Sequence, residues 1–122
     1  MEKRRILVVE DDPDVLAVMV RHLELRGYTV IEANDGMEGL EKLKNGGYDM
    51  VITDIVMPFV SGLGIVSAAK SSHPETPVIA ITGYGKEPES AAIESNADLV
   101  LSKPIKMAEL LEHINRLFQE AQ

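Results

Sequence analysis

The sequence predicts an α/β protein in which a doubly wound, five-stranded parallel sheet is covered by five helices. Two observations lead to this prediction. Five short apolar runs alternate along the chain with longer amphipathic segments, which is the pattern of a sheet with helices on both faces. The apolar runs are nearly continuous in Val, Ile and Leu, as expected for parallel strands that are buried on both sides.

Each predicted strand is a short run that is rich in β-branched residues. The runs are RILVV (5–9), TVIEA (29–33), MVIT (50–53), PVIAIT (77–82) and LVLS (99–102).

The segments between these runs have the apolar spacing of helices. The predicted helices cover residues 14–26, 35–45, 62–71, 88–95 and 107–118. Gly27 stops the first helix, and the second opens on Asp35, which can cap it together with Glu38 three residues later. The segment 88–95 has only a thin apolar face, whereas the last helix has a strong one.

Length and composition limit the classes of protein that fit. A chain of 122 residues forms one domain, 1–122. The absence of cysteine excludes disulfide and thiol chemistry and fits a cytoplasmic location. No apolar run approaches the length of a membrane span, and no signal peptide is recognisable. A net charge of −8 would repel a phosphate backbone, so direct binding to nucleic acid is not expected.

Polar residues follow the ends of four predicted strands. In a sheet of this kind, the functional crevice lies at the carboxyl ends of the strands. Three carboxylates that follow the first strand would lie near one carboxylate, one hydroxyl and one ammonium at the ends of the third, fourth and fifth strands. These residues are Glu10, Asp11, Asp12, Asp54, Thr82 and Lys103.

Each of these residues also has an ordinary structural interpretation. Asp12 precedes Pro13 and fits the N-cap of a helix, and taken alone this role is favoured over metal binding. Thr82 fits the end of a strand, and Lys103 fits a solvated surface. Asp54 is different, because a carboxylate on a buried strand is costly unless a cation or hydrogen bonds compensate it. The joint placement at one sheet edge favours a single site.

The residue types at this edge indicate phosphoryl chemistry. Crowded carboxylates attract a hard divalent cation, and Mg²⁺ prefers oxygen ligands of this kind. Asp54 can then act as a nucleophile toward phosphorus, while Lys103 and Thr82 neutralise the phosphoryl oxygens. The predicted product is an aspartyl phosphate.

The motifs resemble those of response-regulator receiver domains of two-component signal transduction, and the resemblance covers nearly the whole chain. The matching motifs, in order, are VVEDDP, DIVMPFVSG in the form D-x-x-M-P-x-x-x-G, ITG and SKP. The resemblance implies the flavodoxin-like receiver fold with strand order 2-1-3-4-5. It also implies a signalling switch that phosphorylates and dephosphorylates itself and does not turn over an external substrate.

The resemblance assigns roles to individual residues. Asp54 would be the phosphoacceptor, Asp11 and Asp12 would form the acidic pair, and Asp12 and Asp54 would bind Mg²⁺ with the carbonyl of Val56. Thr82 would be the switch hydroxyl. Lys103 would pair with the phosphoryl group and precede a cis peptide bond to Pro104.

The resemblance also implies partners. A sensor histidine kinase or a phosphotransfer protein would supply the phosphoryl group, and a downstream protein or attached effector would read the face formed by the fourth helix, the fifth strand and the fifth helix. Phosphorylation would also allow the chain to form a dimer. The sequence departs from the family at Val100, where an aromatic residue is usual, and a β-branched valine has no ring to swing inward.

Three other classes of protein fit the sequence less well. A flavodoxin-like electron carrier needs a loop after the first strand that holds a flavin phosphate, and EDDPD would repel it. A phosphohydrolase with an Asp nucleophile usually has a second Asp two residues later, where this chain has Val56. A receiver-like interaction module without phosphorylation is disfavoured by the acidic residues, Asp54 and Lys103.

Overall fold

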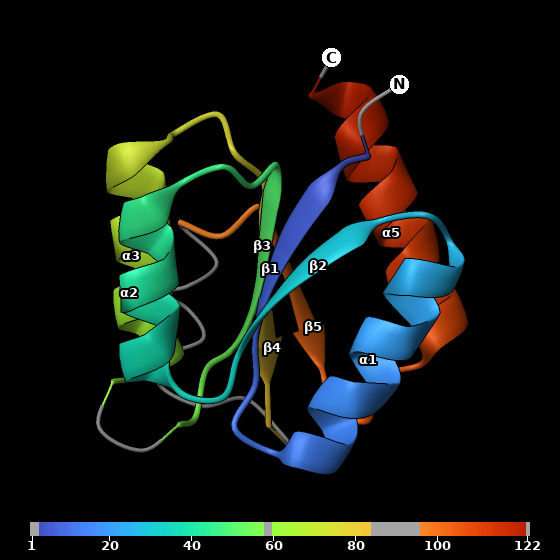
Figure 1. Cartoon of the computed structure of the whole chain (residues 1–122), viewed down its shortest axis with the longest axis horizontal. Helices are drawn as coiled ribbons and strands as arrows, with labels where there is room; N and C mark the ends of the chain where they lie inside the picture. Colours follow the sequence, from blue (N-terminus) through green and yellow to red (C-terminus); the bar gives the residue numbers. More distant parts are fainter. Residues whose placement is uncertain (1–2, 58–59, 84–95, 122) are drawn as a thin grey trace.

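A five-stranded parallel sheet forms the centre of the molecule (Figure 1). The computed structural model describes residues 3–57, 60–83 and 96–121. The strand order is β2-β1-β3-β4-β5, and every neighbouring pair is parallel. The sheet and its order are those predicted. The strands are Arg5–Val9 (β1), Thr29–Ala33 (β2), Met50–Asp54 (β3), Val78–Thr82 (β4) and Leu99–Ser102 (β5).

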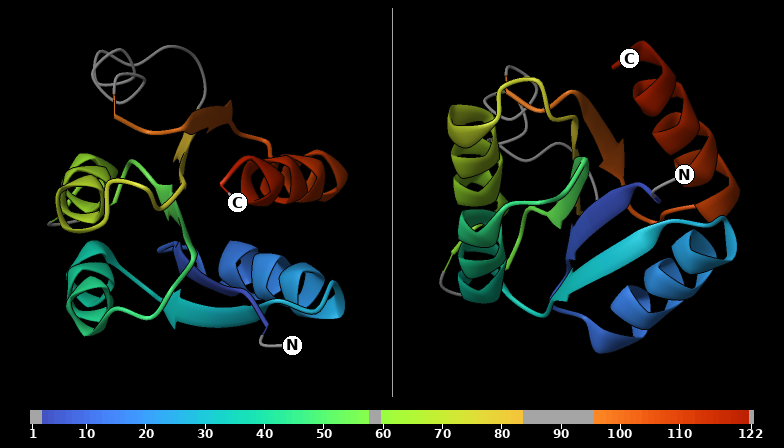
Figure 2. Two further views of the ribbon diagram at one scale, coloured as in Figure 1. Left: turned by 90° about the horizontal axis from the view of Figure 1, so that it is seen from above. Right: turned by 45° about the horizontal axis from the view of Figure 1, so that its top comes forward.

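Helices connect the strands and lie on both faces of the sheet. The described helices are Pro13–Leu25 (α1), Gly36–Asn45 (α2), Gly62–Ser72 (α3) and Met107–Glu120 (α5). Figures 1 and 2 show α1 and α5 on one face and α2 and α3 on the other. The helix predicted at 88–95 lies outside the described residues. No helix in the described part of the chain has both the length and the apolar character needed to cross a bilayer.

The two faces of the sheet bury two separate apolar clusters. Ile6 and Val8 of β1 pack with α1 and α5, whereas Leu7 and Val9 pack with α2 and α3. This division follows from the alternation of side chains along a strand, which sends odd and even positions to opposite faces. The alternation also decides which side of the sheet each polar residue at the strand ends will occupy.

Acidic side chains cap the first two helices. Asp12 Oδ1 accepts hydrogen bonds from the backbone N–H groups of Asp14 at 2.9 Å and Val15 at 3.3 Å, so the N-cap interpretation of Asp12 is correct. Asp35 Oδ1 accepts from the N–H of Glu38 at 2.8 Å. The Glu38 carboxylate accepts from the N–H of Asn34 at 2.8 Å, one residue before the cap, and so it extends the expected capping pattern.

Helix α3 begins against the backbone of the strand that carries Asp54. A Cβ atom at Gly62 would overlap the carbonyl oxygen of Asp54 and approach the Cα of Ile55 within 2.5 Å. The N–H of Gly62 donates to the carbonyl of Ile55 at 2.7 Å. The glycine of the D-x-x-M-P-x-x-x-G motif is therefore needed for this close approach, which fixes the backbone around Asp54.

Candidate functional site

Strand register brings Glu10 and Asp54 to the same place on the sheet. Val8 of β1 is paired with Ile52 of β3, and Glu10 and Asp54 each lie two residues further along. Both side chains therefore leave the sheet on the face that α1 and α5 cover. Lys103 follows Leu101 by two residues, and Leu101 packs in the cluster on that face. Three charged side chains from three strands consequently share one edge and one face.

Asp54 is held by hydrogen bonds at both carboxylate oxygens. The side chain is only 3% exposed. Its Oδ1 accepts from the N–H of Ile55 at 2.9 Å, and its Oδ2 accepts from Lys103 Nζ at 3.0 Å. The ammonium of Lys103 also lies 3.8 Å from Glu10 Oε1, and the Lys103–Pro104 peptide bond is cis. The structure thus joins Asp54 and Lys103, as expected from the sequence.

A cluster of three carboxylates can hold a cation. Carboxylate oxygens of Glu10, Asp11 and Asp54 all lie within 4.8 Å of one another. Glu10 is 1% exposed, and its Oε2 is buried with no hydrogen-bond partner among the described residues. A buried carboxylate oxygen without a donor is costly. A hard cation that prefers oxygen ligands fits this set of donors.

Asp12 does not belong to this cluster, although the sequence predicts that it forms the acidic pair with Asp11. Its Oδ1 accepts hydrogen bonds from N–H groups at the start of α1, and the carboxylate that lies with Asp11 and Asp54 is that of Glu10. The alternation Ile6, Val8, Glu10 is the signal that identifies Glu10, because it continues the buried face of β1 beyond the end of the strand. The carbonyl of Val56 stays a predicted ligand, and its side chain is 59% exposed.

Burial and neighbouring charges shift the pKa values of two groups. Desolvation, together with the nearby Asp54 carboxylate, raises the pKa of Glu10 from 4.5 to about 7, although Lys103 opposes this shift. Burial alone would lower the pKa of Lys103, but its hydrogen bond to Asp54 and the charges of Asp54, Glu10 and Asp11 raise it overall. Lys103 therefore stays cationic, whereas Glu10 keeps its proton to a higher pH than a carboxylate in water does.

Thr82 lies at the same edge but makes its contacts with β5. It is 3% exposed, and its Oγ1 lies 3.3 Å from the Leu101 carbonyl and 3.3 Å from Ser102 Oγ. Val100, which replaces the usual aromatic residue, is partly buried and packs in the cluster under α2 and α3. The hydroxyl of Thr82 is therefore near the site and is engaged by the neighbouring strand.

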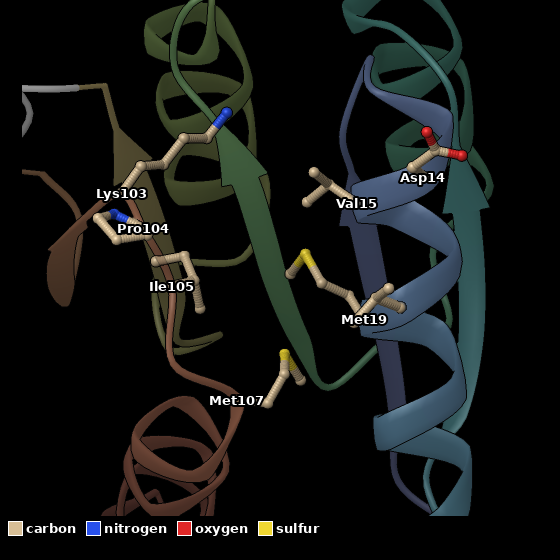
Figure 3. A pocket seen from close by; sticks show the side chains of 8 residues that line it. Asp14, Val15, Met19, Lys103, Pro104, Ile105 and Met107 are labelled. Carbon is tan, nitrogen blue, oxygen red and sulfur yellow. The ribbon is translucent and has the colours of Figure 1, made fainter.

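An apolar groove of about 380 Å³ borders the site and shares Lys103 with it. Figure 3 shows Val15 and Met19 of α1 facing Ile105 and Met107, which follow β5. The lysine chain extends past the groove toward the end of β3, where its ammonium reaches Asp54. Val18, which also lines the groove, is 49% exposed. The groove therefore presents apolar surface directly beside the charged site.

Comparisons with known proteins agree with this geometry. Residues 6–115 match the family model of the response regulator receiver domain. The transcriptional regulatory protein YkoG of Bacillus subtilis is 33% identical over 121 residues, which cover 98% of this chain and 53% of YkoG. PrrA of Mycobacterium tuberculosis is 35% identical over 116 residues, which cover 94% of this chain and 50% of PrrA. The chain thus spans about half the length of these curated relatives.

Solved structures show the same fold. A CheY-like receiver domain protein from Methanospirillum hungatei matches with a TM-score of 0.92 and 31% identity, covering 98% of this chain and 97% of that one. The response regulator TrrA from Thermotoga maritima, in complex with Mg(2+)-BeF, matches with a TM-score of 0.84 and 32% identity, covering 93% and 98% of the two chains. This chain belongs to the family of response-regulator receiver domains of two-component systems.

Proposed function

We propose that this chain is a phosphorylation-dependent switch that accepts a phosphoryl group on Asp54 from a histidine kinase or a phosphotransfer protein. The observation that supports this most strongly is the buried Asp54 carboxylate, held at 3.0 Å by the Lys103 ammonium. Two further carboxylates lie beside it at the carboxyl edge of the sheet. A carboxylate nucleophile, a fixed cation and a cluster of oxygen ligands are the groups that phosphoryl transfer needs.

The proposed step is an in-line displacement at phosphorus. An Asp54 oxygen forms a bond to phosphorus while the bond from phosphorus to the donor's imidazole nitrogen breaks, and the departing imidazole keeps the electron pair. Lys103 is placed to neutralise a phosphoryl oxygen, because its ammonium already contacts Asp54. The Thr82 hydroxyl would donate to a second oxygen after it turns from β5. The chain carries the phosphoryl group itself, so it is not an enzyme that turns over an external substrate.

Glu10, Asp11 and Asp54 are the residues that we assign to Mg²⁺, together with the Val56 carbonyl that the family resemblance implies. Their carboxylates fit a hard cation because they are crowded and one buried oxygen lacks a partner. Bound Mg²⁺ would supply positive charge next to the phosphoryl oxygens. In this proposal Glu10 replaces Asp12, whose side chain caps α1.

The phosphodonor protein is assigned to the apolar groove beside Lys103. A donor must bring its phosphoryl group to Asp54, and a protein seated between α1 and the segment 103–107 would lie next to that residue. The apolar lining suits hydrophobic side chains of such a protein. The groove shares Lys103 with the site, so docking and phosphoryl transfer would occur side by side.

The output of the switch would follow from the added charge. Phosphorylation adds about −1.5 to −2 charges at neutral pH, and this charge would attract Lys103 and Thr82. A downstream protein or an attached effector would read the change, as the transcriptional regulators among the relatives suggest. The proposed surface comprises the segment 88–95, which lies outside the described residues, together with β5 and α5. Such signalling would take place in the cytoplasm.

Incubation with acetyl phosphate tests the function. With Mg²⁺ present, intact-mass spectrometry should show the addition of one phosphoryl group to most of the protein. The same incubation in excess chelator should give little or no modified protein, because the repulsion among the carboxylates is then not relieved. Equal modification with and without chelator would contradict the proposed role of the metal, and no modification under either condition would contradict the function.

Mg²⁺ should raise the melting temperature of the wild type, because a ligand that binds only the folded state stabilises it by mass action. At ten times the dissociation constant, the stabilisation is about 1.4 kcal/mol. Asp11→Asn should lose most of this response, whereas Asp12→Asn should keep it. Asn is as good an N-cap as Asp, so the Asp12 variant preserves α1 and is a matched control. A lost response in Asp12→Asn with a normal one in Asp11→Asn would reverse the assignment.

A further inference from the structure

The hydroxyl of Thr82 is engaged by two groups of β5. Its Oγ1 lies 3.3 Å from the carbonyl oxygen of Leu101 and 3.3 Å from Oγ of Ser102. A hydroxyl has one proton and two lone pairs. Thr82 can therefore donate its proton to the Leu101 carbonyl while it accepts the proton of Ser102, and both contacts are satisfied at once.

Strand register explains why these two hydroxyls meet. Thr82 and Ser102 are paired across β4 and β5, and Ala80 and Val100 are paired two residues earlier. All four side chains lie on the same face of the sheet, because they are separated by two residues along each strand. Neither Ala80 nor Val100 supplies an aromatic ring there. The side-chain link between the ends of these strands, among the described residues, is the hydroxyl pair.

Thr82 must break this link to reach a phosphoryl group on Asp54. The Asp54 side chain leaves the sheet on the face of α1 and α5, whereas Thr82 leaves it on the face of α2 and α3. A hydroxyl that turns toward the phosphoryl oxygens gives up its contacts with Leu101 and Ser102. Any group that stabilises the β5-facing orientation therefore opposes the engagement of Thr82 with the phosphoryl group.

We propose that Ser102 is a positioning residue that holds the Thr82 hydroxyl against β5 and so sets how readily Thr82 engages the phosphorylated site. The inference rests on the proposed function. The hydroxyl pair supplies a direct coupling between the site and β5 where the chain has Val100 in place of an aromatic ring. Ser102 is exposed, so water replaces Thr82 as its hydrogen-bond partner when the Thr82 hydroxyl turns toward the phosphoryl group. The hydrogen bond between Ser102 and Thr82 therefore stabilises the β5-facing orientation only weakly.

Beryllofluoride with Mg²⁺ provides the probe, since it resembles a phosphoryl group on a carboxylate. Ser102→Ala should bind it two- to fivefold more tightly than the wild type, which corresponds to roughly 0.4–1 kcal/mol. Ser102→Thr keeps the hydroxyl and should bind with nearly wild-type affinity. In NMR spectra without beryllofluoride, the amide signals of Thr82 and Gly83 should move toward their bound positions in Ser102→Ala.

A double-mutant cycle separates positioning from a general effect on the strand end. In a Thr82→Val background the hydroxyl is absent, so Ser102→Ala should leave the beryllofluoride affinity unchanged. An equal change in both backgrounds, or no change in the wild-type background, would overturn the role of Ser102. If the wild type itself fails to bind beryllofluoride with Mg²⁺, the proposed function fails as well, and the two failures are therefore distinguishable.

Discussion

Asp54→Asn should abolish phosphorylation by acetyl phosphate, whereas Asp12→Asn should be phosphorylated nearly as well as the wild type. Asp54 is buried, and its Oδ2 accepts a hydrogen bond from Lys103 Nζ at 3.0 Å. An amide at this position has nearly the same shape but is not a nucleophile toward phosphorus. Intact-mass spectrometry after incubation with Mg²⁺ and acetyl phosphate measures the result directly.

The Asp12 variant is the control that makes the experiment specific. Asp12 is two positions from Glu10 in the same acidic run, but its Oδ1 accepts hydrogen bonds from the first turn of α1. Asn keeps this cap, so any loss of modification would come from the site and not from the helix. Modification of Asp54→Asn at the wild-type level would show that another residue accepts the phosphoryl group.

The positions of Asp54 and Lys103 could be predicted because each follows a continuous apolar run. Such runs are recognisable as buried parallel strands, and the carboxyl ends of parallel strands meet at one edge. The contact of 3.0 Å between the two side chains is therefore a consequence of sequence pattern. The close packing of Gly62 on the Asp54 backbone is also a consequence of sequence pattern, because Gly62 ends the D-x-x-M-P-x-x-x-G motif that begins at Asp54.

The choice among Glu10, Asp11 and Asp12 required more than the pattern. Three adjacent acidic residues at the end of a strand differ only in the direction in which their side chains point. That direction depends on the residue at which the strand ends and the helix begins. The register of Val8 with Ile52 puts Glu10 beside Asp54, while Asp12 becomes the cap of α1. The side-chain orientation of Thr82 likewise could not be predicted from the sequence, because it depends on hydrogen-bond partners from β5 that only the folded sheet supplies.

The metal-free protein should lose stability as the pH rises from about 5 to 7, and Glu10→Gln should remove most of this loss. Burial, with repulsion from Asp54 added, raises the pKa of Glu10 from 4.5 to about 7. Between these values the unfolded chain has released the proton that the folded chain still holds. The free energy of unfolding therefore falls with increasing pH in this window and levels off above it.

The expected size of the effect follows from the shift itself. One pKa unit corresponds to about 1.4 kcal/mol, so the shift of Glu10 amounts to about 3 kcal/mol at pH 8. Gln is neutral at every pH and its side-chain oxygen can still accept the hydrogen bond that Glu10 Oε1 receives from the N–H of Asp12. The variant should accordingly match the wild type near pH 4.5 and exceed its stability by about 3 kcal/mol at pH 8.

Urea unfolding in excess chelator at pH 5, 6, 7 and 8 measures this difference. Glu112→Gln is the matched control, because Glu112 is exposed and its replacement should change the unfolding free energy by less than about 0.5 kcal/mol. Added Mg²⁺ should stabilise the wild type more than Glu10→Gln at pH 8, since the cation relieves the repulsion that the variant no longer has. An equal pH dependence in Glu10→Gln and the wild type would show that Glu10 ionises in the folded protein as easily as in water, and that the carboxylate cluster is not strained by its own charge.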